Sequence, residues 1–505
     1  MESTRTLLHI FSLTLCILAV GLQAAVATEP DIAKSSGTLI EEMSRADRKT
    51  LEKMLDRELM VAAERIKLLE GQRRFNIKTL LVPFKRKLVI DLGRDAVPSN
   101  NGSALEEQNH QLMLTAMELT REIISIDEYE FRYGGHDIYF YHPERLSQPT
   151  RSATKSTATP LIMVAAGHGI YYHHGFGDWR AQRDPYNGVT EDFITPYFSR
   201  DLATQLTSRA RVSVAKARTN DVDIHASTGQ PWWKLAARYY LKSQYPDNPE
   251  IWNSLPTSIS DSRERDEDIR SRPLFANQVG ANYVINLHTD GSQNPGVRGT
   301  KAYYQTGRDI DAALATNILC NMKQTIQAKS TYADWDVALA PIGSDKGENR
   351  LATSPAVIIE LGFHTNPSDA AALQSATFRT AAVKGIERGM VDHPAGIACF
   401  PFRISDIPKF GALTNAAMDM VVHFQGTPRF PVVLRTRNIK CPTGWTCGPT
   451  TKSFYLEQDS PLVRRFSCTG TPPASGTFLY AATLTDADGV AAGEFQYTYT
   501  CTVPV

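Results

Sequence analysis

Two histidines and two glutamates stand where they could act together on a metal ion and a water molecule. His168 follows the apolar run LIMVAA inside a Gly-His-Gly turn, and His288 ends the apolar run YVINLH. Glu191 lies at the start of a predicted helix, and Glu360 lies inside the apolar run AVIIEL. Because an unpaired buried carboxylate is costly, a glutamate within such a run is a candidate for a functional role.

These residue types suit a catalytic zinc site. Two imidazoles and one carboxylate, with the fourth position left to water, are a usual zinc shell in hydrolases. We therefore take His168, Glu191 and His288 as candidate ligands, and Glu360 as the candidate general base. A single histidine at a strand end is more often a hydrogen-bonded structural residue. Four such positions on successive elements of one domain favour the metal site.

The elements that must position these residues form an α/β pattern. Four apolar runs, LIMVAA, RVSVAKA, YVINLH and AVIIEL, predict strands of a sheet covered on both faces. Helical stretches lie between or after them, at about 191–209, 309–328 and 369–390. This order predicts a three-layer α/β domain. The carboxyl ends of strands form the usual ligand crevice of such a sheet, so the candidate residues should meet there.

Several ordered segments resemble a known family. GHG, TE-DF, R-AN-VGA-YVINLH, VRGTKAYY and PAVIIELGFHTN, within residues 161–391, are similar to the zinc-dependent N-acetylmuramoyl-L-alanine amidases of bacterial cell walls. The resemblance implies a mixed sheet flanked by helices and one zinc ion per chain. It implies His168, Glu191 and His288 as zinc ligands and Glu360 as the catalytic carboxylate. The implied reaction is hydrolysis of the amide between N-acetylmuramic acid and L-alanine in peptidoglycan.

The sequence also departs from this family. His288-Thr289-Asp290 stands where the family usually has His-Ala-Asn, and an insertion at 220–262 contains Trp232-Trp233. Its length suggests the hypothesis that the insertion covers the metal site until a partner displaces it. His364, just past Glu360, is expected to support catalysis or to be structural. These departures bear on which substrate is cleaved more than on whether the metal site is present. Other motif positions, expected to be structural or to contact substrate, are Asn277 and Arg298-Gly299.

The first residues predict export. Arg5 precedes the apolar stretch LLHIFSLTLCILAVGL, and Ala25-Val26-Ala27 matches a small-residue cleavage site. Residues 1–27 are therefore predicted to be a signal peptide, with an uncleaved membrane anchor as the alternative. The mature chain is expected in the periplasm or outside the cell, without stable membrane insertion.

A helical accessory region is predicted for residues 28–128. An apolar stripe indicates a helix from about 36 to 75, and Ser103-x-x-Glu106 has the form of a capping box that starts a helix running to about Ile124. Neither helix carries residues that suggest chemistry. Residues 129–140 alternate with period two around Gly134-Gly135, which predicts a hairpin.

The catalytic domain is predicted at 129–398, and a small disulfide-bearing β-sandwich at 399–505. Four cysteines in the last 65 residues allow three pairings, which the sequence does not decide. We expect Cys441–Cys447 and Cys468–Cys501. Asp486-Ala-Asp488-Gly489 is expected to be a β-turn rather than a calcium loop. Two earlier cysteines, Cys320 and Cys399, are expected to be buried or loosely paired thiols.

Composition limits the other function classes. The chain has 505 residues, is 42% hydrophobic, and balances 54 Lys+Arg against 54 Asp+Glu. This balance argues against a nucleic-acid partner. The expected partners are peptidoglycan and an envelope or activator protein. A serine hydrolase is disfavoured because no G-x-S-x-G is present.

Two alternatives stay open. One is a zinc carboxypeptidase-like peptidase or another amidohydrolase. Such peptidases often have His-x-x-Glu, whereas Tyr171 stands three residues after His168. The other alternative is a non-catalytic protein that binds the cell envelope.

Overall fold

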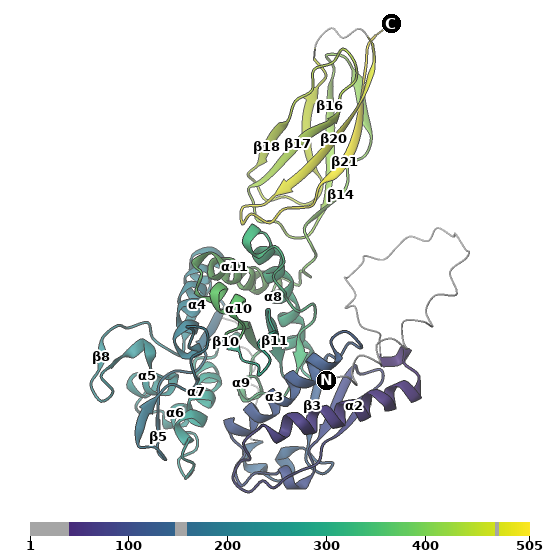
Figure 1. Cartoon of the computed structure of the whole chain (residues 1–505). Coiled ribbons are helices and arrows are strands. Elements are labelled where there is room, and N and C mark those ends of the chain that lie inside the picture. The colour runs from purple at the N-terminus through teal and green to yellow at the C-terminus, as the bar shows by residue number, and fades with distance from the viewer. Residues whose placement is uncertain (1–39, 147–158, 470–473, 505) are drawn as a thin grey trace. The chain divides into compact units, whose positions relative to one another are not determined.

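A computed structural model describes residues 40–146, 159–469 and 474–504 (Figure 1). The predicted signal peptide, 1–27, lies outside the described residues. None of the helices in the described ranges is long and apolar enough to cross a membrane.

The main architectural feature is a mixed sheet of nine strands, as predicted. In spatial order the strands are β1 (Lys78–Val82), β2 (Lys87–Asp91), β3 (Glu128–Arg132), β12 (Ile342–Gly343), β11 (Lys301–Tyr304), β13 (Ala356–Phe363), β10 (Tyr283–Asp290), β4 (Leu161–Ala166) and β7 (Ser213–Lys216). The neighbours β13, β10, β4 and the edge strand β7 are parallel, and β11 runs antiparallel to β13.

Helices cover both faces of this sheet, which gives the predicted three layers (Figure 1). Alternate side chains of β4 show the two faces, because Ile162 packs in one apolar cluster and Met163 in another. The first cluster includes α4 (Glu191–Gln205), α8 (Asp309–Gln327), α10 (Pro367–Gln374) and α11 (Ala376–Asp392). The second includes α5 (Ala237–Gln244), α6 (Pro249–Trp252) and α7 (Arg263–Val279). A short helix, α9 (Gly347–Leu351), precedes β13.

The N-terminal region contains the predicted helices as α2 (Arg45–Glu64) and α3 (Ser103–Thr120), both shorter than expected. After α2 the chain leads through buried Phe75 and Ile77 into β1. The region therefore also extends the nine-stranded sheet. The predicted hairpin at 129–140 was wrong, because β3 pairs in parallel with β2 and β12. Only a single bridge, Tyr133 to His136, closes the Gly-Gly turn.

Short hairpins lie in two loops of the α/β region. They are β5 (Tyr171–His173) with β6 (Asp178–Arg180), and β8 (Ile224–His225) with β9 (Gln230–Pro231). A π-helical turn, Leu206–Ala210, follows α4. Single turns of 3-10 helix are Ile40–Glu42, Arg94–Ala96, Ile138–Phe140, Pro143–Arg145, Trp232–Lys234 and Ser330–Tyr332.

The C-terminal residues form two sheets around one apolar cluster, as predicted for a small β-sandwich. One sheet has the order β14 (Arg403–Asp406), β16 (Ala417–Gln425), β19 (Leu462–Ser467); the other has β15 (Phe410–Leu413), β21 (Phe495–Thr502), β20 (Gly476–Thr485), β17 (Val432–Lys440), β18 (Thr450–Phe454).

Three disulfides are present in the described residues. Cys441–Cys447 and Cys468–Cys501 confirm the expected pairs. Cys320 and Cys399 are not thiols but are bonded to each other, which ties the start of the C-terminal part to α8. Their separation of 79 residues explains why the sequence did not indicate this pair.

Candidate metal centre and active-site cavity

The order of the strands brings the candidate residues to one edge of the sheet. β10 lies between β4 and β13 and is parallel to both. His288 on β10 is the register partner of Glu360 on β13, so the two residues lie side by side. His168 directly follows the end of β4, and Glu191 begins α4.

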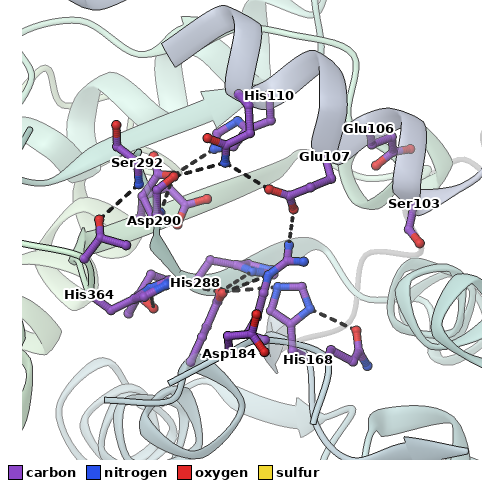
Figure 2. Close-up of a pocket in the computed structure, with 18 of the residues that line it drawn as sticks. Ser103, Glu106, Glu107, His110, His168, Asp184, His288, Asp290, Ser292 and His364 are labelled. Carbon is purple, nitrogen blue, oxygen red and sulfur yellow. Dashed lines mark hydrogen bonds and ion pairs between the residues drawn. The ribbon is translucent and has the colours of Figure 1, made fainter. Parts of the chain in front are cut away.

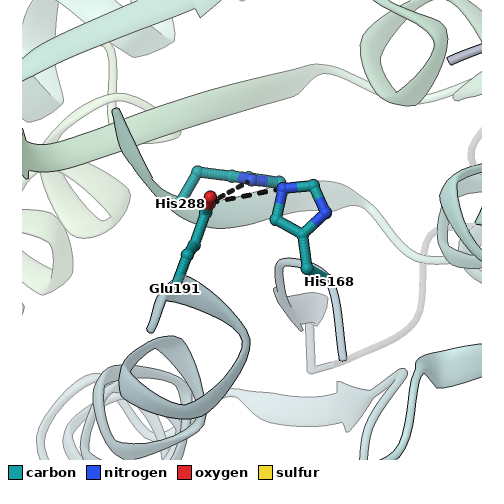
Figure 3. A group of neighbouring side chains, drawn as sticks. All are labelled: His168, Glu191 and His288. Atoms are coloured by element: carbon teal, nitrogen blue, oxygen red, sulfur yellow. Dashed lines mark hydrogen bonds and ion pairs between the residues drawn. The ribbon is translucent and has the colours of Figure 1, made fainter. Parts of the chain in front are cut away.

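Three of these side chains converge on a common point (Figure 3). Glu191 Oε1 lies 2.9 Å from His288 Nδ1 and 3.4 Å from His168 Nε2. One ligand atom from each residue lies within 4.8 Å of the others, and all three residues are buried. The backbone N–H of Thr289 also donates to Glu191 Oε1, at 3.0 Å.

The Gly-His-Gly turn has a steric reason. A Cβ atom on Gly167 would lie 2.5 Å from the ring of His288, so only glycine lets the two histidines approach. His168 itself has a φ of 60°, and Gly169 has a φ of 134° with Ala236 close to where a Cβ would stand. The turn thus aims His168 back toward β10.

Asp192 fixes this turn to the first turn of α4. Its carboxylate accepts hydrogen bonds from the backbone N–H groups of Gly169 at 2.8 Å, Gln182 at 2.7 Å and Arg183 at 3.1 Å. The position of Glu191 relative to His168 is therefore set by its neighbour in sequence.

The outer nitrogen atom of each histidine also has a buried partner. His168 Nδ1 lies 3.0 Å from Gln182 Oε1, and His288 Nε2 lies 3.0 Å from Glu348 Oε2. Both acceptors call for an N–H on the outer nitrogen, so the inner nitrogen, His168 Nε2 or His288 Nδ1, is the one that a metal ion would take as its ligand.

The two acceptors are themselves connected. The Gln182 amide nitrogen donates to Asp268 at 2.9 Å, and the Arg272 guanidinium donates to Asp268 at 2.7 Å and also to Glu348. This connected set of side chains, Gln182, Asp268, Arg272 and Glu348, is buried and contacts the outer nitrogen of each imidazole. We call it the outer ring.

The donor set fits a zinc ion. The two inner imidazole nitrogens and one carboxylate oxygen match the ligands of a three-residue zinc site. Burial would lower the pKa of His288, but Glu348 and Glu191 raise it to about 10. The residues around the His288 imidazole thus stabilise a positive charge, and a divalent cation would also supply one.

Glu360 lies beside this group with a free oxygen. The residue is 8% exposed, and its Oε2 atom has no hydrogen-bond partner among the described residues. Burial raises the pKa of Glu360 well above its usual range, and Asp290 adds to the rise while His288 opposes it. A carboxyl group at this place can accept a proton from a water molecule and return it to a leaving group.

All four predicted residues line one cavity of about 710 Å³ (Figure 2). One wall comes from α3, outside the region expected to carry chemistry, through Glu106, Glu107, His110 and Gln111. His110 Nε2 lies 2.8 Å from Asp290 Oδ1, and Lys346 Nζ lies 3.0 Å from His110 Nδ1. The interpretation of α3 as a helix without chemistry therefore missed part of the cavity.

The insertion does not line this cavity, since none of the cavity's lining residues lies in 220–262. Trp233 packs against Phe193 and Tyr197, and Trp232 against His225. The hypothesis that the insertion covers the metal site therefore receives no support from the geometry.

Of the other motif residues, one lines the cavity and the others make structural contacts. His364 lines the cavity, and its Nδ1 lies 2.9 Å from Thr289 Oγ1. Asn277 bonds the backbone of Leu351 and Thr353, which is a structural role. Arg298 lies over the ring of Trp335 and donates to a backbone carbonyl.

Comparison with known proteins finds similarity to amidases. Residues 162–392 match the profile of the N-acetylmuramoyl-L-alanine amidase family. An N-acetylmuramoyl-L-alanine amidase of Mycobacterium tuberculosis is 27% identical, over 29% of this chain and 68% of that protein. Residues 162–392 are therefore similar to the amidase domain, which supports an N-acetylmuramoyl-L-alanine amidase activity for this chain.

Solved structures of similar proteins are also amidases. One from Clostridium difficile 630 is 16% identical and covers 47% of this chain and 98% of its own, with a TM-score of 0.33. An apo amidase of Mycobacterium abscessus is 17% identical and covers 46% and 98%, with a TM-score of 0.31.

Proposed function

We propose that this protein is an exported zinc amidase that hydrolyses the amide between N-acetylmuramic acid and L-alanine in peptidoglycan. The observation that carries the proposal is the meeting of His168, Glu191 and His288 within 4.8 Å, in a cavity that also contains the free carboxylate oxygen of Glu360. The family match of residues 162–392 supports the substrate.

One zinc ion per chain would be held by His168, Glu191 and His288. When bound, zinc acts as a Lewis acid on the scissile carbonyl and on the attacking water. The outer ring keeps both histidines in the tautomer that such binding requires.

Glu360 moves the proton in this proposal. Its Oε2 atom takes a proton from the attacking water as the water adds to the carbonyl carbon. The same carboxyl group then gives that proton to the departing nitrogen of L-alanine as the C–N bond breaks. The products are a free muramic lactyl carboxylate and a peptide with a free amino terminus.

Replacing Glu360 with Gln tests this assignment. The variant keeps the size of the side chain but cannot accept the proton. We expect turnover of muramyl peptides to fall by roughly a hundredfold or more, while the zinc content stays near one per chain. Zinc is measured by atomic spectroscopy on the same samples. Full turnover in Glu360→Gln would assign the base to another residue.

The setting of the enzyme is part of the proposal. Cleavage after residue 27 would release the chain into the periplasm or the extracellular space. Residues 28–128 and 399–505 would serve the catalytic region 129–398 as accessory domains. An envelope or activator protein is proposed as a partner in addition to peptidoglycan.

A further inference from the structure

Two arginines on the cavity wall share one glutamate of α3. Glu107 Oε2 lies 2.8 Å from Arg183 Nη2 and 3.9 Å from Arg265 Nη2. All three residues line the cavity, and Figure 2 shows Glu107 directed from α3 into it. The two guanidinium groups therefore make this part of the cavity wall suited to binding a carboxylate.

The two arginines differ in how well their charges are compensated. Arg183 also pairs with Glu191, at 3.4 Å. Arg183 is thus fully occupied.

Arg265 is not. Within the described residues its guanidinium has the 3.9 Å ion pair with Glu107 and no hydrogen bond, and its Nε is buried without a partner. Burial and the nearby charge of Arg183 lower its pKa, so a further anion beside Arg265 would be stabilised. The side chain is 17% exposed, which leaves its outer nitrogens open to the cavity.

We propose that Arg265 binds a free carboxylate on the peptide of the substrate, one residue beyond the scissile amide. This inference rests on the proposed function. Arg183 and Glu107 hold each other and keep Arg265 in place. A planar guanidinium with free donors suits a carboxylate, which it can bind through two hydrogen bonds.

The position of Arg265 fits this ligand. The contacts run from Glu191 at the metal centre to Arg183, then to Glu107 and Arg265 along one wall. A peptide extends about 3.5 Å per residue, so its second residue lies a short step from the scissile bond. The second residue of a peptidoglycan stem is D-glutamate linked through its γ-carboxyl, which leaves its α-carboxylate free.

The test compares two muramyl tripeptides that differ in this one group. In both, the C-terminus is amidated and D-glutamate is linked through its γ-carboxyl; its α-carboxyl is free in one and amidated in the other. For Arg265→Ala we expect the KM of the acid substrate to rise by roughly tenfold or more, since hydrogen bonds between two charged groups are lost. The KM of the amide substrate should stay within about twofold, with kcat retained on both.

Two further variants make this result specific. Arg265→Lys keeps the charge and should recover part of the discrimination between acid and amide. Arg180→Ala removes an arginine that does not line the cavity and should leave both KM values unchanged. Equal effects of Arg265→Ala on the two substrates would overturn the proposal.

Binding separates this inference from the proposed function. If neither substrate is hydrolysed by the zinc-loaded chain, the proposed reaction fails. Calorimetry with the two tripeptides without sugar then decides the subsite. Tighter binding of the acid form that is lost in Arg265→Ala supports the carboxylate site, and equal binding of both forms contradicts it.

Discussion

At the scale of single residues, the two histidines of the metal centre are held by acceptors of different charge. His168 faces the neutral amide of Gln182, whereas His288 faces the carboxylate of Glu348. A carboxylate behind a ligating imidazole increases the basicity of the ring and fixes its orientation. Glu348 should therefore matter for metal affinity although it is not itself a proposed ligand.

Replacing Glu348 with Gln tests this role. We expect zinc affinity to fall by roughly ten- to a hundredfold, which is typical for loss of such a partner. Competition with a chromogenic chelator measures the affinity directly, without any substrate. Glu106→Gln is the matched control, because Glu106 lines the same cavity but contacts none of the three proposed ligands. An unchanged affinity in Glu348→Gln would show that the carboxylate does not support His288.

At the scale of elements, the sequence predicted that His168, His288 and Glu360 lie near one another, because parallel strands end at one edge of a sheet. It did not predict that α3 lines the cavity. A helical stripe shows which face is apolar, but not which element the polar face meets. The outer ring was missed for a similar reason, since Gln182 and Glu348 lie in segments without a regular pattern.

The start of α3 depends on a residue far along the chain. Instead of a capping box, Asp266 of α7 accepts hydrogen bonds from the backbone N–H of Ser103 at 2.9 Å and from its hydroxyl at 2.5 Å. The predicted helix start is thus right, while its cap comes from another element. This bond holds α3, with Glu107 and His110, against the catalytic region.

Asp266→Ala should loosen this wall of the cavity. Loss of a cap costs about 1 kcal/mol, and the buried Ser103 groups left without an acceptor add to that cost. We expect the free energy of unfolding, measured in urea, to fall by about 2 kcal/mol. Ser103→Ala removes only the hydroxyl and should cost less. Equal stability of Asp266→Ala and the wild-type chain would mean that α3 is held by its apolar face alone.

At the scale of the whole molecule, ion pairs join the β-sandwich to the catalytic region. The predicted β-turn is confirmed, since the N–H of Gly489 donates to the carbonyl of Asp486. The turn's acids bind cations of the catalytic region: Asp486 meets Arg388 at 2.9 Å, and Asp488 meets Arg209 at 3.0 Å. Partners that lie 279 residues apart, as Arg209 and Asp488 do, leave no local signal in the sequence.

Asp488→Asn should weaken the contact between the β-sandwich and the catalytic region, and the size of this effect should depend on pH. Burial would raise the pKa of Asp488, but Arg209 and Lys384 lower it to about 2. A lowered pKa stabilises the folded chain above the unfolded value of about 4, by about 2 kcal/mol at pH 7. The difference in unfolding free energy between wild type and variant should shrink as the pH falls from about 4 to about 2. A difference that does not change with pH would contradict the assigned ion pairs.

The most direct test of the central claim is the identity of the bond that the zinc-loaded chain cleaves. Purified peptidoglycan is digested with and without a chelator, and the soluble fragments are analysed by mass spectrometry. We predict peptides that begin with a free L-alanine amino group, absent when the chelator is present. Cuts within the peptide or the glycan, or no release at all, would contradict the account.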